Sequence, residues 1–459
     1  MIKKKQLPFK AVNQNLMTDP NNQPLWNNAI NLVIGGCGLL SKRPTRYNSS
    51  NWPSYYKSAK GIKIKSIQNK WYKDYSEFSI GCNLLGYRPK EHHLILKKLH
   101  RTPPLTTLLS PDEPHLAEDL NLFLNTNKLW RFTRGGGEAL SLAIRYARAI
   151  TNTDKVLVCG YHGWHDWYLA SNLSSNSNLD ETFLKGLEPV GVPKYLKDSA
   201  FTPSKLDKNS IQKILNENKI KILFIEAARY EYLTDEITNS IKEFQQAGGL
   251  IVADEVTSGL RVEKKLAVYK LGINPDIVVL GKSLGAGWPI AAVGCNYIHK
   301  NRLEDVFASS TFWTEQSGLL AGRLTIKRLS NWDRFYEKLF QNASSLRENF
   351  IRSFDRSNVD IKINSLPTMI SYKFNFLDFD ERESSALFID RLVNKGYLTS
   401  STIYPTICHS NRENILFCKN VLNTLKELNL KIKDSSNNVR NHLKSLGYLE
   451  RGFSRTQSL

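Results

Sequence analysis

Lys282 and Asp254 are the residues of this chain with the clearest potential for chemistry. Each comes at the end of a short apolar run that is typical of a buried parallel strand, since Lys282 follows DIVVLG and Asp254 closes LIVAD. A lysine amine can attack an aldehyde, and a neighbouring carboxylate can keep a pyridine nitrogen protonated. Pyridoxal phosphate needs both groups, so the pair predicts a site for this cofactor.

The surroundings of the pair favour the same interpretation. Three glycines around the lysine (Gly281, Gly285 and Gly287) leave room for a bulky ring beside Lys282. After the amine has released the cofactor to a substrate, it can serve as the base that moves the proton from the substrate Cα. Asp254 is expected to be buried and to need a cationic partner, and Val256 can press on one face of the ring. The alternatives are a surface lysine in a glycine-rich loop and an aspartate that caps a turn.

A glycine run supplies a candidate phosphate site. The segment TRGGGEAL places Gly135, Gly136 and Gly137 directly before an expected helix. Free backbone amides and the helix dipole attract an anion at such a position. The lysine of a P-loop is missing, so a nucleoside triphosphate is not expected. Three glycines before a helix can also be a simple turn.

Further polar side chains follow other strands. Tyr161 and His162 come after one strand, where Tyr161 can stack on a flat cofactor and His162 can hydrogen-bond near it, and Glu226 closes another. Because ligands bind at the carboxyl ends of parallel strands, these residues are expected to converge on one pocket. The alternative is a buried aromatic corner. A metal site formed by His162, His165 and Asp166 is not expected, since no other His or Cys pair in the chain supplies the remaining ligands.

The elements that must position these residues alternate between short strands and amphipathic helices. Strands are expected at 155–159, 220–226, 249–255, 276–281 and 290–295, and helices at 139–150 and 237–248. This alternation predicts an α/β fold with a mostly parallel sheet flanked by helices.

The two ends of the chain have a different pattern. We expect a large domain over 71–334 and a smaller α+β domain formed by 1–70 and 335–459 together. A strand is expected at 368–376, a helix at 381–396 and a short closing helix at 441–447.

Composition limits the other classes of protein to which this chain can belong. The chain has 459 residues, of which 41% are hydrophobic, and six cysteines without a CxxC pair, so free thiols are expected rather than disulfides or a zinc ribbon. The N-terminus lacks the apolar core of a signal peptide, and no run is long enough to span a membrane, so a cytoplasmic location is expected. The net charge of +20 is spread along the chain without a basic stripe, and a nucleic-acid partner is therefore not expected.

Beyond these residues, the chain resembles the class III pyridoxal phosphate aminotransferases, most of all the glutamate-1-semialdehyde aminomutase branch. The resemblance is carried by LVIGGCGLLSKRP, KWYKDYSEFSIGCNLLGYRP, TRGGGEALSLAIRYARA, YHGWHD, DEVTSGLR, DIVVLGKSLGAGWPIAAVG and SSTFWTEQSGLLAG. It implies the type I fold of pyridoxal phosphate enzymes, with a seven-stranded sheet.

The resemblance also implies roles for individual residues. Lys282 would form the Schiff base and Asp254 would bind the pyridine nitrogen, while Tyr161 would stack on the ring and Gly136 and Gly137 would bind the phosphate. Thr311 would reach the phosphate of a neighbouring subunit's cofactor, which implies a homodimer with shared sites. Lys42 or Arg43 lies near the position of a substrate-carboxylate arginine.

Three departures from the family pattern lie around the substrate and the phosphate. Gly135, Gly136 and Gly137 replace the usual Ser-Gly-Thr, Glu226-Ala227 replaces Glu-Pro, and YHG continues as WHDWY, which resembles members associated with surface-polysaccharide and amino-sugar metabolism. The leading interpretation is an aminotransferase that moves an amino group from a small-molecule donor to a carbonyl acceptor. The alternatives are the aminomutase that makes 5-aminolaevulinate and a non-catalytic homologue that binds the cofactor without turnover.

Overall fold

The computed structural model describes residues 23–47, 49, 51–174 and 189–445. Its largest unit is a seven-stranded sheet in the order β4-β10-β9-β8-β7-β5-β6. The strands are β4 (Lys128–Thr133), β5 (Val156–Cys159), β6 (Ala200–Phe201), β7 (Ile222–Ile225), β8 (Leu250–Glu255), β9 (Ile277–Leu280) and β10 (Ala291–Asn296). Within this sheet, β10 runs antiparallel to both of its neighbours and the other pairs are parallel. The expected type I sheet is confirmed.

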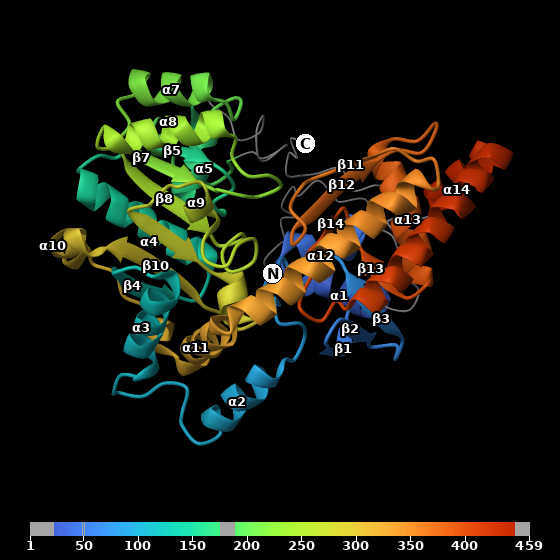
Figure 1. Ribbon diagram of the computed structural model, residues 1–459, viewed down its shortest axis with the longest axis horizontal. Coiled ribbons are helices and arrows are strands. Elements are labelled where there is room, and N and C mark those ends of the chain that lie inside the picture. The colour runs from blue at the N-terminus through green and yellow to red at the C-terminus, as the bar shows by residue number, and fades with distance from the viewer. Residues whose placement is uncertain (1–22, 48, 50, 175–188, 446–459) are drawn as a thin grey trace, which may run out of the picture.

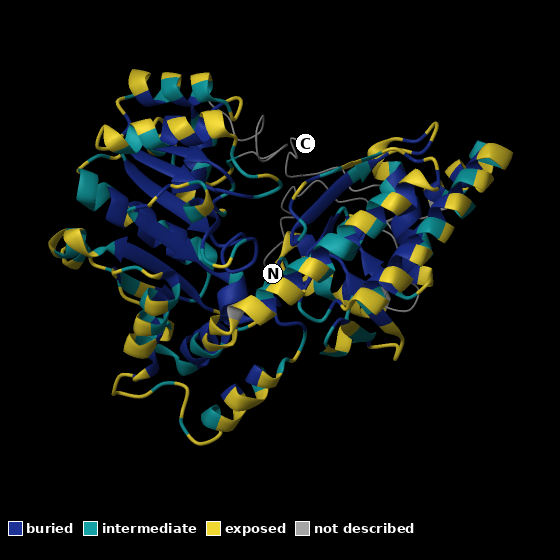
Figure 2. Cartoon of the chain, viewed as in Figure 1, coloured by how far each residue is buried: buried dark blue, intermediate teal, exposed yellow. Residues whose placement is uncertain are grey.

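Both faces of this sheet are covered, which explains why its central strands are apolar throughout. Alternate residues of one strand enter different hydrophobic clusters, as Leu223 and Phe224 of β7 do. Helix α4 (Gly136–Thr151) packs on the face of Phe224, whereas α7 (Lys208–Glu217) and α8 (Asp235–Gln246) cover the face of Leu223. Figure 2 shows the dark, buried strands between these helices.

The expected strands and helices of this region are confirmed, with at most three residues of difference at their ends. Helix α8 begins after Thr234, whose hydroxyl accepts the N–H of Ile237, and Gly248 beyond its end has a φ of +88°. This left-handed conformation favours glycine at the end of a helix. Two strands were not predicted, because β4 mixes charged and apolar residues and β6 has only 2 residues.

The N- and C-terminal parts of the chain share a second sheet, on the other side of the molecule in Figure 1. Its order is β1-β2-β3-β13, and β13 runs parallel to β3. The strands are β1 (Tyr56–Lys60), β2 (Lys63–Ser66), β3 (Trp71–Tyr75) and β13 (Tyr397–Thr399). The domain boundaries at 70/71 and 334/335 stay a prediction, and β3 lies just beyond the first of them.

A three-stranded sheet and three long helices complete this part of the chain. They are β11 (Ile361–Ile363), β12 (Ile370–Phe374), β14 (Thr402–Ile403), α12 (Trp332–Asp355), α13 (Glu381–Asn394) and α14 (Asn411–Ser445). The expected strand at 368–376 and helix at 381–396 correspond to β12 and α13. The expected short helix at 441–447 is not a separate element, because residues 441–445 continue α14 beyond a kink at Ser435, and residues 446 and 447 lie outside the described part of the chain.

The remaining elements connect these units. They are the helices α1 (Gln23–Leu32), α2 (Lys90–Leu99), α3 (Asp112–Leu124), α5 (Asp166–Leu169), α9 (Ala267–Lys270), α10 (Lys300–Glu304) and α11 (Gln316–Ser330), and the 3₁₀ turns η1 (Leu40–Lys42), η2 (Pro44–Tyr47), η3 (Ala170–Leu173), η4 (Lys194–Leu196), η5 (Lys282–Gly285), η6 (Tyr297–His299) and η7 (Thr311–Thr314). All six cysteines are free, as expected. In the described ranges, no helix has the length and apolar character needed to cross a membrane.

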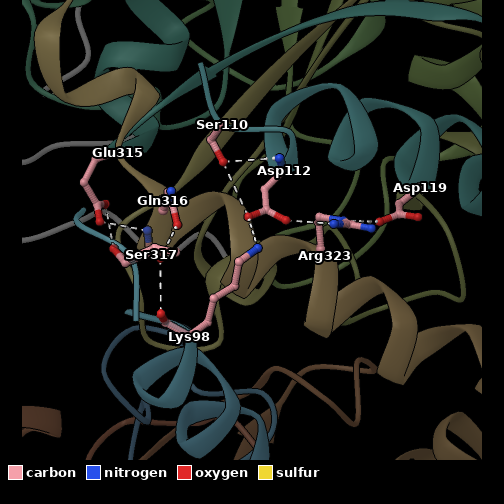
Figure 3. Close-up of polar contacts among 9 residues, drawn as sticks. Lys98, Ser110, Asp112, Asp119, Glu315, Gln316, Ser317 and Arg323 are labelled. Carbon is pink, nitrogen blue, oxygen red and sulfur yellow. Dashed lines mark hydrogen bonds and ion pairs between the residues drawn. The ribbon is translucent and has the colours of Figure 1, made fainter. Parts of the chain in front are cut away.

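An ion-pair network joins α2, α3 and α11 (Figure 3). The buried carboxylate of Asp112 accepts hydrogen bonds from Lys98 at 2.6 Å and from Arg323 at 2.7 Å, and Arg323 also binds Asp119 at 3.0 Å. Burial opposes the ionisation of Asp112, but the two cations outweigh it and lower the pKa of this carboxyl. The network attaches the middle of α11 to α2 and α3, and the helix itself begins at Gln316, shortly after the turn η7.

Candidate active site

The predicted lysine and aspartate lie at the carboxyl edge of the seven-stranded sheet. Asp254 is in β8, where it pairs with Val279 of the adjacent β9, and Lys282 begins the 3₁₀ turn η5 just beyond β9. The backbone of Lys282 is in the left-handed region, with a φ of +41°. Its Nζ atom donates a hydrogen bond to the hydroxyl of Thr257 at 2.5 Å. The amine is therefore oriented by a side chain of the same DEVTSGLR segment that carries Asp254.

Asp254 is only 3% exposed and is bound by two donors. Its Oδ1 atom accepts the N–H of Val256 at 3.0 Å, and its Oδ2 atom lies 2.8 Å from Nδ1 of His162, which is fully buried. Because a carboxylate accepts, Nδ1 of His162 carries the hydrogen. The other ring nitrogen, Nε2, is buried without a hydrogen-bond partner in the described part of the chain.

Val256 connects the lysine turn to the glycine run. A Cβ atom at Gly136 would lie 2.8 Å from Cγ1 of Val256, and one at Gly281 would lie 3.2 Å from the same atom. Real Cβ atoms do not make contacts as short as the first. The absence of side chains at Gly136 and Gly281 therefore lets the two loops close around Val256 at the floor of the site.

The glycine run lies at the start of α4, where Gly135 is the N-cap and Gly136 and Gly137 are the first helical residues, although all three glycines were expected to precede the helix. The N–H groups of Gly136, Gly137 and Glu138 stand at the first positions of the helix, where no acceptor exists within the helix itself. The preceding amides are used internally, because the Glu138 carboxylate accepts from the N–H of Arg134 at 2.9 Å and of Gly135 at 3.3 Å. The donor set for an anion is thus the helix start at Gly136 and Gly137.

Arg134 ties this loop to the turn η7. Its guanidinium donates to the carbonyls of Phe312, Glu315 and Pro289 and forms an ion pair with the Glu315 carboxylate at 3.1 Å. Thr311 at the start of η7 is exposed, and the contacts of the described residues do not bring it to Lys282 or Asp254.

A second cluster surrounds Tyr161. The backbone N–H of Tyr161 donates to Oε2 of Glu226 at 2.8 Å, and Nη1 of Arg229 donates to both oxygens of Glu226 at 2.8 and 3.0 Å. The guanidinium carbon of Arg229 lies 5.2 Å from the centre of the Tyr161 ring. Burial disfavours the charge of Arg229, but Glu226 outweighs it and the pKa of the guanidinium is raised.

A buried arginine lies beneath the lysine turn. Arg261 is fully buried and donates to the carbonyls of Gly81, Thr368 and Pro405, and burial lowers its pKa to about 10. The hydroxyl of Ser283, next to Lys282, donates to the same Gly81 carbonyl at 3.2 Å. Residues 78–81 all have a positive φ, so this left-handed turn is held against the lysine by two donors.

Lys42 and Arg43, the two residues that the resemblance places near a substrate carboxylate, have different surroundings. Lys42 is exposed, and together with Lys282 and Arg261 it opposes the rise that burial causes in the pKa of the Cys82 thiol. Arg43 instead donates from Nε to the carbonyl of Gly35 at 3.2 Å.

The residues present fit pyridoxal phosphate. A buried carboxylate, an oriented amine, an apolar floor at Val256 and a glycine cradle at a helix start occupy one edge of the sheet.

Sequence reasoning missed Thr257, Arg134, Arg229 and Arg261. Thr257 and Arg261 lie in the DEVTSGLR motif, and their place in this motif could have identified them. Arg134 and Arg229 could not be identified in this way, because the spacing of residues in the sequence does not show which residues they contact. In the ranges that the structure covers, no group of three or more His, Cys, Asp or Glu side chains is placed to hold a metal ion.

Fold and site together define a type I transferase of the pyridoxal phosphate class. The family model "Aminotransferase class-III" matches residues 46–408. The chain belongs to this family, which confirms the resemblance and makes it a member of an enzyme family.

Several curated relatives are aminomutases. The chain is 28% identical over 412 residues to the glutamate-1-semialdehyde 2,1-aminomutase of Wigglesworthia glossinidia brevipalpis, with 83% of this chain and 92% of the relative covered. It is 25% identical over 367 residues to that of Methanosphaera stadtmanae, with 77% and 83% covered. The 3-aminobutyryl-CoA aminotransferase of Cloacimonas acidaminovorans is also 25% identical, with 75% and 81% covered.

Solved structures share the fold. The FumI protein of Sphingopyxis sp. MTA144, solved with PLP, superposes with a TM-score of 0.80 at 21% identity, over 91% of this chain and 98% of that chain. A glutamate-1-semialdehyde aminomutase from Pseudomonas aeruginosa superposes with a TM-score of 0.74 at 18% identity, over 90% and 95%. The expected cofactor agrees with the PLP form of the first of these structures.

Proposed function

We propose that this chain is a pyridoxal phosphate-dependent aminotransferase that moves an amino group from a small-molecule donor to a carbonyl acceptor. The observation that carries the proposal is that the Lys282 amine, bound to Thr257, and the buried Asp254–His162 pair follow or close adjacent strands at the same edge of the sheet, where helix α4 also begins. Membership of the aminotransferase class-III family supports it.

Each residue has a defined task in this proposal. Lys282 holds the cofactor at its aldehyde carbon and then carries a proton on Nζ to and from the substrate. Asp254 binds the pyridine nitrogen through a carboxylate that His162 and the Val256 N–H keep in place. Tyr161 and Val256 enclose the ring, Gly136 and Gly137 bind the phosphate, and Glu226 orients Tyr161. The cofactor supplies an aldehyde that accepts the amino group and a ring that withdraws electron density from the substrate.

The proposed assembly is a homodimer with shared sites. Thr311 is exposed at the start of η7, and two large apolar side chains near it, Phe307 and Phe312, are 82% and 62% exposed. Such a surface is typical of a protein–protein contact. In the proposal this turn meets the neighbouring subunit, where Thr311 reaches the phosphate. A cytoplasmic location stays a prediction.

A second candidate function is that of a glutamate-1-semialdehyde 2,1-aminomutase. Curated aminomutases that align over most of their length favour it, among them those of Methanosphaera stadtmanae and Wigglesworthia glossinidia brevipalpis. The altered phosphate run and the Glu226-Ala227 loop favour intermolecular transfer instead, because both departures surround the place of the substrate.

The test combines a spectrum with two assays. Purified protein is incubated with pyridoxal phosphate and its visible spectrum is recorded before and after addition of amino donors, and the product of glutamate-1-semialdehyde is assayed for 5-aminolaevulinate. Borohydride reduction should fix the cofactor to the peptide of Lys282. Lys282→Ala should abolish both attachment and turnover, and Lys300→Ala, which changes a lysine with a 45% exposed side chain, serves as the control.

The outcomes separate the candidates. Donor-dependent spectral change without 5-aminolaevulinate establishes the aminotransferase, and 5-aminolaevulinate formation establishes the aminomutase. A bound cofactor that responds to neither donor nor semialdehyde contradicts both and leaves the non-catalytic homologue.

A further inference from the structure

We infer that Arg229 is a positioning residue of the cofactor pocket, which raises the affinity for pyridoxal phosphate by fixing the ring of Tyr161 and the carboxylate of Glu226. The inference rests on the proposed function, since it assumes that the cofactor ring stacks on Tyr161. Arg229 lies in the loop that departs from the family pattern after Glu226, and the resemblance gives it no role.

The contacts of Arg229 form a closed triangle. Glu226 accepts from the Tyr161 N–H and from Arg229, and the guanidinium of Arg229 lies over the Tyr161 ring. One carboxylate therefore fixes the backbone of Tyr161 while the cation above the ring fixes its side chain. A cation within about 6 Å of an aromatic ring is attracted by the ring face.

The loop that carries Arg229 is anchored to the C-terminal part of the chain. Ala228 and Tyr232 form an antiparallel bridge, so that Arg229 stands in a tight hairpin. The fully buried Asn364 donates to the carbonyl of Tyr230 at 2.5 Å, and the N–H of Ser365 donates to the Glu231 carboxylate at 2.6 Å. The arginine is thus presented by a loop whose turn is held in place, which lowers the entropy cost of keeping the side chain over Tyr161.

The buried carboxylate of Glu226 needs the positive charge of Arg229 as its partner. The Glu226 side chain is 5% exposed, and a Cβ atom at Gly160 would lie 2.8 Å from its Cγ and Oε2 atoms, so the carboxylate is tightly packed. Removal of the guanidinium leaves Glu226 as an unpaired buried charge, which is among the most unfavourable changes that a protein interior can undergo.

The experiment titrates pyridoxal phosphate into the apo form of the full chain and measures the dissociation constant from the visible absorbance. The variants are Arg229→Met, Arg229→Lys, Glu226→Gln and the double variant Arg229→Met with Glu226→Gln. Arg352→Met, at an arginine that is 68% exposed, is the matched control. The free energy of unfolding of each apo protein is measured in parallel.

We expect Arg229→Met to raise the dissociation constant by about tenfold or more, because an unpaired buried charge is left beside Tyr161. Arg229→Lys should restore part of the affinity, since it keeps the charge without the planar fork. The double variant should bind more tightly than Arg229→Met alone, because a neutral amide at position 226 can still accept the Tyr161 N–H. A general loss of structure is recognised separately, because it would lower the free energy of unfolding of the apo protein in step with the affinity.

The experiment distinguishes a failure of the proposed function from a failure of the inference about Arg229. Wild-type protein that does not bind pyridoxal phosphate overturns the proposed function, and the inference falls with it. Wild-type binding with an unchanged dissociation constant in Arg229→Met, or a double variant no better than the single one, overturns the inference alone. If Arg229→Met does not fold, Arg229→Lys and the double variant decide: affinities equal to that of the wild type in both overturn it.

Discussion

The Nδ1 atom of His162 lies 2.8 Å from Oδ2 of Asp254, and both side chains are removed from solvent. The two residues are 92 positions apart in the sequence and follow or close different strands of the same sheet. Their contact gives the buried aspartate a donor on the side that the Val256 N–H does not serve.

The first prediction concerns this contact. His162→Phe keeps an aromatic ring but removes the donor, so Asp254 is left with one hydrogen bond and binds a pyridine nitrogen in a less defined position. We expect the affinity for pyridoxal phosphate to fall by about tenfold, because a hydrogen bond to a charged group is worth about 1.5 kcal/mol or more. His162→Asn, whose amide nitrogen can replace Nδ1, should retain more affinity. Equal titration curves for the two variants would contradict this role.

The second prediction distinguishes the three glycines of the phosphate run. Gly135 has an extended backbone and open space where a Cβ atom would stand, whereas a Cβ at Gly137 would lie 2.6 Å from the His165 ring and one at Gly136 would meet Val256. Gly135→Ser should therefore fold normally and bind inorganic phosphate and the cofactor at least as well as wild type. Gly136→Ala should lose cofactor affinity. Calorimetric titration of the variants tests the difference, and a tolerated Gly136→Ala would disprove it.

The third prediction concerns Arg261. Arg261→Met would leave the carbonyls of Thr368 and Pro405 without the donor that binds them, and one donor of the Gly81 carbonyl would be lost. We expect the free energy of unfolding to fall by about 3 kcal/mol or more, because several buried groups lose their partner at once. Urea denaturation measures the change, with Arg352→Met as the exposed control. A loss below about 1 kcal/mol would mean that these carbonyls find other partners.

The fourth prediction is a pH dependence at Glu255. Burial raises the pKa of this carboxyl to about 7, although hydrogen bonds from Ser258 and from the Val268 N–H oppose the shift. The folded state therefore keeps a proton that the unfolded chain releases near pH 4.5, so this group favours the folded state below pH 4.5 and the benefit is lost as the pH rises to 7.

Glu255→Gln removes this titration. Between pH 5 and pH 8 the stability of the variant should rise relative to that of wild type by about 2–3 kcal/mol. Denaturation at several pH values measures the difference. A constant difference across this range would show that Glu255 does not hold the proton.

Much of the fold could be predicted because apolar runs and glycines report directly on local structure. The strand before Asp254 and the strand before Lys282 are each uniformly buried, so their sequences are unambiguous. The strand β4 was missed since Lys128 at its start and Arg131 within it are charged. Lys128 can be buried because its amine donates to the carbonyl of Pro275 at 2.8 Å and to Oδ1 of Asn296 at 2.6 Å.

Individual residues of the site could be predicted from the sequence, but most of the contacts between them could not. Lys282 and Asp254 were recognisable by type and position, but the partners of Arg229 and Arg134 depend on how distant loops meet. Arg134, for example, binds the carbonyl of Glu315, 181 positions away. Spacing along one chain does not report such contacts, because each is set by the packing of several elements.

The pairing of β3 with β13 has a consequence for how the protein folds during its synthesis on the ribosome. The hydroxyl of Thr399 in β13 donates to the carbonyl of Tyr75 in β3, across 324 positions of sequence. The hairpin strands β1 to β3 emerge early, yet their sheet gains its last strand only after most of the chain has been translated. Until then the edge of β3 is open to pairing with other chains, so nascent protein at this stage is the form most in need of a chaperone.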